Sequence, residues 1–138
     1  MRFLDRIQPL GLLVMRLVLG AVMVSHGSQK VFGGIHNVEK MVSGIGFPWW
    51  MAYLVATAEF FGGILVVVGL LTRLAAFSIF IDMFVAITKV HWKNGLRGQG
   101  GYEFPLALAA LAFALIFFGA GPISLDALIW KDRAKAKA

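Results

Sequence analysis

An apolar run of 23 residues, Leu10 to Phe32, constrains the fold more than any other feature of the sequence. A helix needs about 20 residues, at roughly 1.5 Å rise each, to cross the hydrocarbon core of a bilayer. The run nevertheless contains Arg16, His26 and Lys30. An ionisable group at membrane depth costs about 2.5–3.5 kcal/mol on insertion scales. We therefore expect a membrane helix with one polar face that other helices must satisfy.

Helical spacing places these polar residues on one side of the helix. Residues three, four or seven positions apart share a helix face. This spacing gives a single stripe, with His26 on its flank: Arg16, Gly20, Met23, Gly27 and Lys30. Small residues on such a stripe let another helix approach closely. We interpret the stripe as the face that packs against the rest of the protein.

The composition extends this interpretation to the whole chain. Its mean hydropathy is +0.82, and 59% of its 138 residues are hydrophobic, which is far more than in a soluble domain. The absence of cysteine excludes disulfides, thiolate metal sites and cysteine nucleophiles. The net charge of +6 indicates loops that face anionic lipid, rather than a nucleic-acid partner.

The apolar runs predict an all-α membrane protein with a single domain, residues 1–138. Four spanning helices are expected, over residues 10–32, 50–71, 74–92 and 103–120, and short links favour a four-helix antiparallel bundle. A short amphipathic helix over 37–45, capped by Asn37, lies between the first two spans. A second short surface helix over 124–130, capped by Ser124, precedes a basic tail, residues 131–138.

Charge in the connecting segments predicts the orientation. Four spans put both termini on one side of the membrane. The termini and the link at Arg73 contain seven lysine and arginine residues, and the two opposite loops contain five. Because cytoplasmic segments carry the excess of positive charge, both termini are expected in the cytoplasm. No small-residue cleavage site follows the first apolar run, so we expect it to remain as an uncleaved helix.

Helical rise gives each charged residue an expected depth. Arg16 and Asp82 lie roughly 9 and 12 Å from the cytoplasmic ends of their helices. They are opposite in charge and matched in depth, which predicts a structural ion pair, with Glu59 as a possible third member. Glu59 is the one charge in the second span and shares a face with small residues, so it should point into the bundle. The remaining polar residues form an expected outer cluster: His26, Lys30, Lys89, His91 and Glu103.

Four motifs carry a resemblance to a known family. They are HGSQKVFGG in the first helix, Glu59 with the following GGILVVVGLLTR, Gly100-Gly101-Tyr102-Glu103, and GAGPISLD after the last span. Together they cover nearly the whole chain and are similar to the DoxX family. The resemblance implies a small four-helix protein of the bacterial inner membrane. It also implies a link to redox chemistry, since some relatives are quinone-linked sulfur oxidoreductase subunits and others partner thiol and superoxide enzymes.

The leading functional prediction is a component of a membrane oxidoreductase system that binds a quinone or a similar lipophilic molecule in the outer half of the bundle. His26 would donate or accept a proton, Glu59 and Glu103 would relay it, and Lys30 would stabilise a developing oxyanion. Lys89 and His91 complete the expected ligand-binding set. No metal is assigned: two histidines and two glutamates at similar depth are compatible with a metal or haem, but His26 and His91 lack paired spacing.

The sequence also supports other interpretations of the charged residues and of the chain as a whole. The charged residues inside the spans can be a structural network that fixes helix register, or a proton or ligand path. The chain can be a non-enzymatic scaffold or small-molecule transporter that recruits soluble redox proteins through its loops and tail. The small-residue faces fit contacts within one bundle as well as between the subunits of a homo-oligomer. Whether the chain is itself an enzyme does not follow from the sequence.

Overall fold

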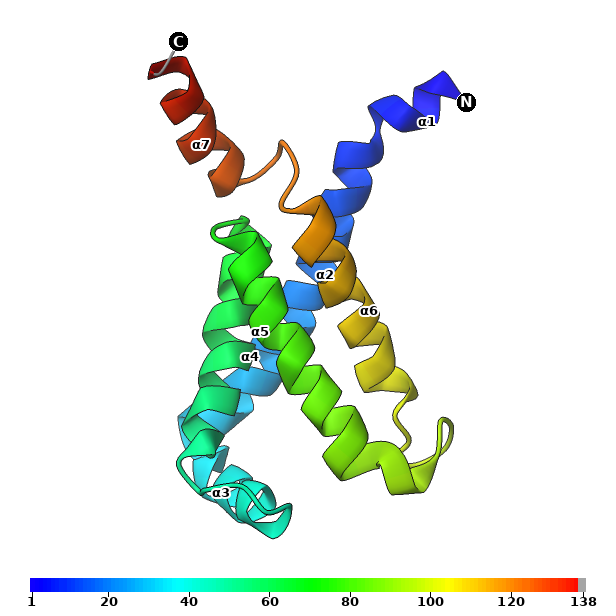
Figure 1. Ribbon diagram of the computed structural model, residues 1–138, viewed down its shortest axis with the longest axis vertical. Helices are drawn as coiled ribbons and strands as arrows, with labels where there is room; N and C mark the ends of the chain where they lie inside the picture. The colour runs from blue at the N-terminus through cyan, green and yellow to red at the C-terminus, as the bar shows by residue number, and fades with distance from the viewer. Residues whose placement is uncertain (137–138) are drawn as a thin grey trace.

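A computed structural model describes residues 1–136 of the chain, and within that range all regular structure is helical. The α-helices are α1 (Arg2–Arg6), α2 (Gln8–Gln29), α3 (Ile35–Gly44), α4 (Met51–Val68), α5 (Thr72–Val85), α6 (Glu103–Phe118) and α7 (Leu125–Ala136) (Figure 1). A π-helical turn, Lys30–Gly34, joins α2 to α3, and another, Ala86–His91, extends α5 into a 3₁₀ turn, Trp92–Asn94. The prediction of an all-α protein is confirmed.

Three helical stretches in the described chain are long and apolar enough to cross a membrane. They are Gln8–Gly44, Met51–Val68 and Thr72–Asn94. The fourth expected span corresponds to α6, which is apolar but has only 16 residues. The large side chains on the outside of these helices are also apolar, among them Val18, Leu54, Phe77 and Phe113, each about half exposed. An outer surface of this kind is compatible with hydrocarbon and not with water.

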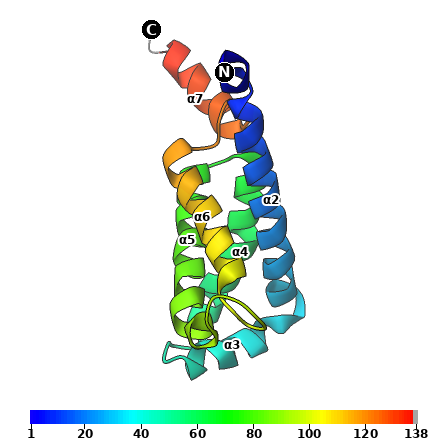
Figure 2. The same ribbon diagram turned by 90° about the vertical axis from the view of Figure 1, so that its right-hand side faces the viewer.

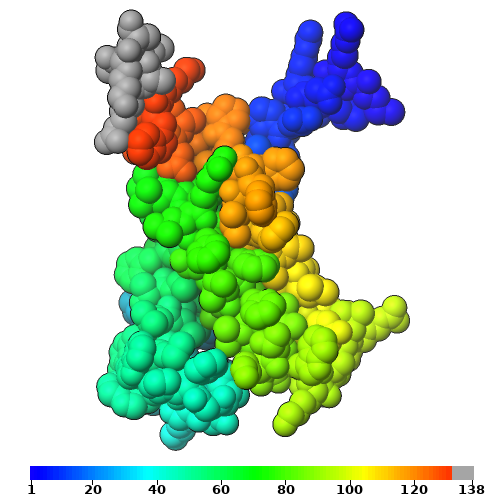
Figure 3. Space-filling view, in the orientation of Figure 1, coloured from blue at the N-terminus to red at the C-terminus, as the bar shows by residue number. Residues whose placement is uncertain are grey.

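The helices pack in sequence order rather than as a closed ring. α2 lies along α4, α4 lies along α5, and α5 lies along α6, whereas α2 and α6 make little contact. α1, α7 and the link between α4 and α5 are at one end of the molecule, and α3 and the loop after α5 are at the other (Figures 1 and 2). In the space-filling view α3 and this loop form two separate projections (Figure 3).

Glycines bring α2 and α4 into close contact. A Cβ atom on Gly27 would lie 2.7 Å from Phe60 Cα, and one on Gly20 would lie 2.8 Å from the carbonyl oxygen of Gly63. Both distances are shorter than a carbon atom tolerates, so the two backbones touch because these positions lack side chains. The stripe expected on the first helix is therefore its packing face, with Arg16, Gly20, Met23 and Gly27 all buried.

A kink separates α2 from the short helix that follows. Phe32 and Gly33 have non-helical backbone angles, and Gly33 has φ of 152°, which favours glycine. α3 begins directly at Ile35, so Asn37 lies inside the helix and the predicted Asn37 cap is wrong. Val38 and Val42 pack with Ala52 of α4. Tyr53 of α4 also donates a hydrogen bond to Glu39 at 3.0 Å. α3 is thus held across the end of α4 rather than free on a surface.

The last helix is longer than the sequence pattern indicates. Ser124 caps it as expected, since its hydroxyl oxygen accepts a hydrogen bond from the Ala127 amide at 3.1 Å. The helix continues to Ala136 instead of ending near Trp130, because the alanine and lysine residues of the tail favour helix. The end of the predicted basic tail, residues 137–138, lies outside the described residues.

Candidate functional site

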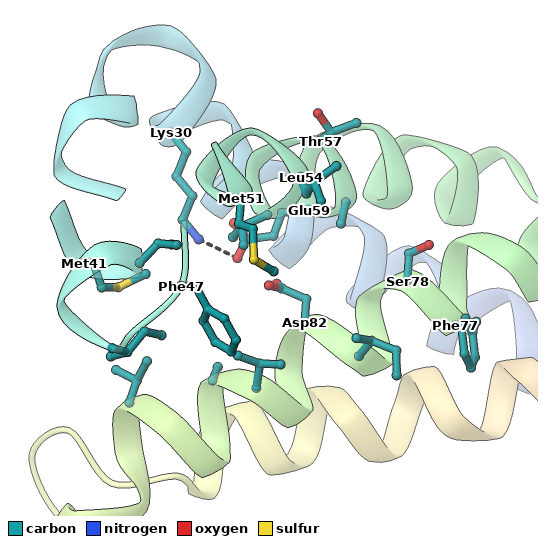
Figure 4. A pocket seen from close by; sticks show the side chains of 18 residues that line it. Lys30, Met41, Phe47, Met51, Leu54, Thr57, Glu59, Phe77, Ser78 and Asp82 are labelled. Atoms are coloured by element: carbon teal, nitrogen blue, oxygen red, sulfur yellow. Dashed lines mark hydrogen bonds and ion pairs between the residues drawn. The ribbon is translucent and has the colours of Figure 1, made fainter. Parts of the chain in front are cut away.

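A cavity of about 500 Å³ lies between α3, α4 and α5. Its walls are almost entirely apolar and include Met41, Val42, Phe47, Met51, Leu54, Phe77, Ile81 and Val85. Phe47, in the segment between α3 and α4, and Met51, in the first turn of α4, lie over it (Figure 4). Leu54, Phe77 and Ile81 are each about half exposed. The cavity therefore reaches the outer surface of the α4–α5 pair at these three exposed side chains.

Three charged side chains gather at the inner wall of this cavity. Lys30 extends from the π-helical turn, and its Nζ donates a hydrogen bond to Glu59 Oε1 of α4 at 2.5 Å. The Glu59 side chain is 5% exposed and that of Lys30 is 22% exposed. Asp82 of α5 points toward Glu59 from the other side (Figure 4). We call Lys30, Glu59 and Asp82 the charged cluster.

The charged cluster contains hydrogen-bonding capacity that the protein does not use. Glu59 Oε2 and Asp82 Oδ2 are both buried, and neither receives a hydrogen bond from a donor group in the described part of the chain. The two carboxyl groups interact with one another and would be linked by a single shared proton. Two carboxyl groups and one ammonium group also leave one negative charge uncompensated if all three are ionised. Burying an unpaired charge or polar atom is costly in free energy, so such groups usually face a partner. The arrangement is therefore suited to a proton or a hydrogen-bonding ligand.

A second, smaller cavity lies on the other side of the Lys30–Glu59 pair. Its volume is about 180 Å³, and it shares five lining residues with the first cavity: Lys30, Met41, Glu59, Ala86 and Val90. His26 and His91 line it as well, together with Phe104, whose ring lies 6.0 Å from that of His26. The ion pair is therefore part of the wall common to the larger apolar cavity and to a pocket lined by His26 and His91.

The structure brings together part of the predicted outer cluster. His26, Lys30, Glu59 and His91 line the smaller cavity. Glu103 and Lys89 are exposed and line neither cavity. His91 also contacts the glycine-rich loop, since its Nδ1 lies 2.8 Å from the carbonyl oxygen of Gly100. Among the described residues, no three histidine, aspartate or glutamate side chains are grouped closely enough to hold a metal ion.

The predicted ion pair between Arg16 and Asp82 is not formed. Arg16 is buried, but its guanidinium donates to four backbone carbonyl oxygens, at 3.0 Å and 2.8 Å to Val66 and Val67 and at 2.9 Å and 2.5 Å to Ala120 and Ile123. The last carbonyls of a helix lack partners within it and carry partial negative charge. Arg16 satisfies those at the end of α4, whereas α5, with Asp82, lies on the other side of α4.

Comparison with known proteins identifies the family. The sequence profile of the DoxX family matches residues 11–92. This chain belongs to the DoxX family. A Bacillus subtilis (strain 168) protein named putative oxidoreductase CatD is 31% identical over 124 residues, which are 90% of each chain. An uncharacterised Haemophilus influenzae protein is 30% identical over 95% of this chain and 99% of its own length. No solved structure matches significantly.

A further DoxX relative supports the cellular setting. The inner membrane protein YqjF of Escherichia coli (strain K12) is 27% identical over 93% of this chain and 98% of its own length. The apolar helices of the present chain agree with such a location. The DoxX protein described here is therefore a membrane protein that contacts lipid through its outer helix faces.

The segment GAGPISLD, residues 119–126, connects several elements at one end of the molecule. Ala120 and Ile123 accept hydrogen bonds from Arg16. Asp126 accepts hydrogen bonds from the backbone amides of Leu71 and Thr72, at 2.7 and 3.0 Å, and thereby caps α5. The sequence pattern marked this segment as characteristic but did not reveal its role. The segment has a structural role at this end of the molecule, whereas the two cavities described above lie toward the end that carries α3.

Proposed function

We propose that this DoxX protein is the ligand-binding membrane subunit of an oxidoreductase system, and that the larger cavity holds a quinone-type or similar lipophilic molecule. The observation that carries the proposal is an apolar cavity that ends at the buried charged cluster. Its volume of about 500 Å³ lies within the roughly 300–1,000 Å³ of small-molecule sites. The name of the B. subtilis relative supports the assignment to redox chemistry.

The position of the cavity favours a ligand that arrives from the membrane. Its open side is bordered by Leu54, Phe77 and Ile81, which are exposed on apolar helices. A lipophilic molecule can pass between these side chains from the hydrocarbon without being transferred into water. An alkyl or isoprenoid tail then remains among the apolar walls, and a polar head group reaches Glu59 and Asp82.

The charged side chains have complementary roles in this proposal. A bound quinone supplies coupled electron and proton transfer. Glu59 and Asp82 hold and exchange the proton of the head group, and Lys30 keeps Glu59 oriented through their hydrogen bond at 2.5 Å. His26, across the ion pair in the smaller cavity, offers the proton a route toward the end of the molecule that carries α3. Glu103 and Lys89, outside both cavities, have no part in this arrangement.

The proposal includes a topology of four spans with both termini in the cytoplasm. The 16-residue α6 crosses with help from the segments that flank it, because a short apolar helix is accommodated by local thinning of the bilayer. α1 and α7 then lie at the cytoplasmic side, and α3 with the glycine-rich loop lies outside. The smaller cavity is on the outer side of the ion pair in this orientation.

A cavity-filling variant tests the proposal. Decylubiquinone is titrated against purified protein in lipid nanodiscs, using wild type, Ala58→Phe and Ala21→Phe. Ala58 lines the cavity, whereas Ala21 is exposed on α2 and serves as the matched control. We expect saturable binding in wild type and control, and binding at least tenfold weaker in Ala58→Phe. Equal affinity of all three folded proteins for decylubiquinone would contradict the proposal. If a soluble redox protein co-purified with the chain and no ligand were bound, a scaffold role would be favoured instead.

A further inference from the structure

We propose that the larger cavity selects lipophilic molecules whose head group donates hydrogen bonds, and therefore binds an alkylphenol or a quinol in preference to the corresponding ether or quinone. This inference rests on the proposed function and specifies its ligand. It follows from the atoms that the protein leaves without a donor group at the polar end of the cavity, Glu59 Oε2 and Asp82 Oδ2.

The polar end of the cavity is rich in acceptors. Glu59 and Asp82 present four carboxyl oxygens, and Lys30 donates to one of them, Glu59 Oε1. Glu59 and Asp82 interact with one another, and a single proton shared between them would link the two carboxyl groups. The remaining lone pairs of their oxygens would still outnumber the donors. A quinone or ether head group brings only further acceptors, which cannot satisfy these oxygens. A hydroxyl group supplies the missing donor, and hydrogen bonds to charged acceptors are the stronger class.

The environment of the cavity favours a neutral hydroxyl over an ammonium group as the donor. The open side is formed by Leu54, Phe77 and Ile81 on the outer surface of apolar helices. A cation entering between them would lose its hydration in the hydrocarbon, which is unfavourable. A phenol or quinol enters uncharged. Lys30 already supplies the cationic partner that Glu59 needs.

A matched pair of probes tests the inference without any redox step. The first probe is 4-heptylphenol and the second is 4-heptylanisole, in which a methyl group replaces the donated hydrogen. Both are titrated against wild-type protein in nanodiscs, with decylubiquinone as a third probe. We expect the phenol to bind at least tenfold more tightly than the anisole, since one hydrogen bond to a charged group is worth that factor or more.

A variant locates the source of the selectivity. Asp82→Leu removes one acceptor group and leaves the Lys30–Glu59 pair in place. We expect the preference for phenol over anisole to fall to threefold or less, with anisole affinity maintained. Equal binding of phenol and anisole to wild type would overturn the inference while leaving lipophilic binding intact. Failure of all three probes to bind saturably would instead reject the proposed function.

Discussion

At the scale of single residues, the charges inside the spans divide into two groups with different partners. Arg16 is matched to backbone carbonyls at the end of α4 and in the segment that follows α6, and each of its three guanidinium nitrogens donates to at least one of them. Lys30, Glu59 and Asp82 are matched incompletely, because two buried carboxyl oxygens receive no hydrogen bond from a donor group among the described residues. Fully satisfied buried groups fix structure, whereas incompletely satisfied ones are expected where a ligand binds.

The role of Arg16 predicts a strong preference for arginine. Arg16→Lys keeps the charge but replaces a planar fork of five donors with a compact ammonium group that cannot reach four carbonyls in two directions. We expect a loss of about 2 kcal/mol or more in the free energy of unfolding. Denaturation of the purified protein in mixed micelles measures it. Arg6→Lys, at an exposed site, is the control and should change little; an equal effect of both substitutions would contradict the assigned role.

The Lys30–Glu59 pair predicts non-additive mutations. Lys30→Met and Glu59→Met each leave a charge without its partner in an apolar cavity, and each should destabilise by about 2 kcal/mol or more. The double variant removes both charges, so its loss should be smaller than the sum by about 1 kcal/mol or more. The pair His36–Glu39, whose histidine side chain is 84% exposed, is the control and should show much weaker coupling. Additive losses at Lys30 and Glu59 would show that the contact contributes no energy.

The spacing of residues along the sequence predicts which side of a helix is buried, but it does not predict which helices are neighbours. Helical periodicity placed Arg16, Glu59 and Gly27 on buried faces, because burial follows from the spacing of residues within one helix. The expected depth of Arg16 in the membrane did not identify its hydrogen-bond partners. Two residues at the same depth can lie on helices that are not neighbours. Asp82 has the matching depth but belongs to α5, which is separated from α2 by α4.

At the scale of elements, two features organise the site. α2 and α4 approach closely at their glycines, and this contact brings Lys30, in the turn directly after α2, next to Glu59 of α4. α3 and the segment that follows it cover one side of the cavity with Met41, Val42 and Phe47. The sequence pattern revealed the apolar face of α3 but not what it covers, since an amphipathic helix has the same pattern on a membrane surface and on another helix.

The α2–α4 contact predicts that added methyl groups are tolerated at one glycine and not at another. A Cβ atom on Gly27 would collide with the backbone of Phe60, whereas one on Gly11 would meet nothing within 4 Å. Gly27→Ala should therefore destabilise by about 2 kcal/mol, because the helices must separate. Gly11→Ala should be neutral or slightly stabilising, since alanine favours helix. Thermal unfolding of both variants checks this, and equal stability would mean that α2 and α4 do not touch here.

At the scale of the whole molecule, four spans with cytoplasmic termini place the two ends of the molecule on opposite sides of the membrane. The natural chain contains no cysteine, so single cysteines can report on each end. In intact cells, a membrane-impermeant maleimide should label Asn37→Cys and Gln99→Cys, and should label Arg2→Cys and Lys131→Cys only after the membrane is opened. Labelling of all four positions from outside, or the reverse pattern, would contradict four spans with cytoplasmic termini.

Photochemical labelling can show whether a lipophilic molecule occupies the cavity against the charged cluster. The probe is a 4-alkylphenol with a diazirine in its alkyl chain, applied to the protein in nanodiscs and followed by mass spectrometry of its peptides. We expect adducts on the α4 and α5 segments around Leu54, Phe77 and Ile81, suppressed by excess 4-heptylphenol and by Ala58→Phe. Adducts spread over all lipid-facing helices and unaffected by either would contradict binding in the cavity.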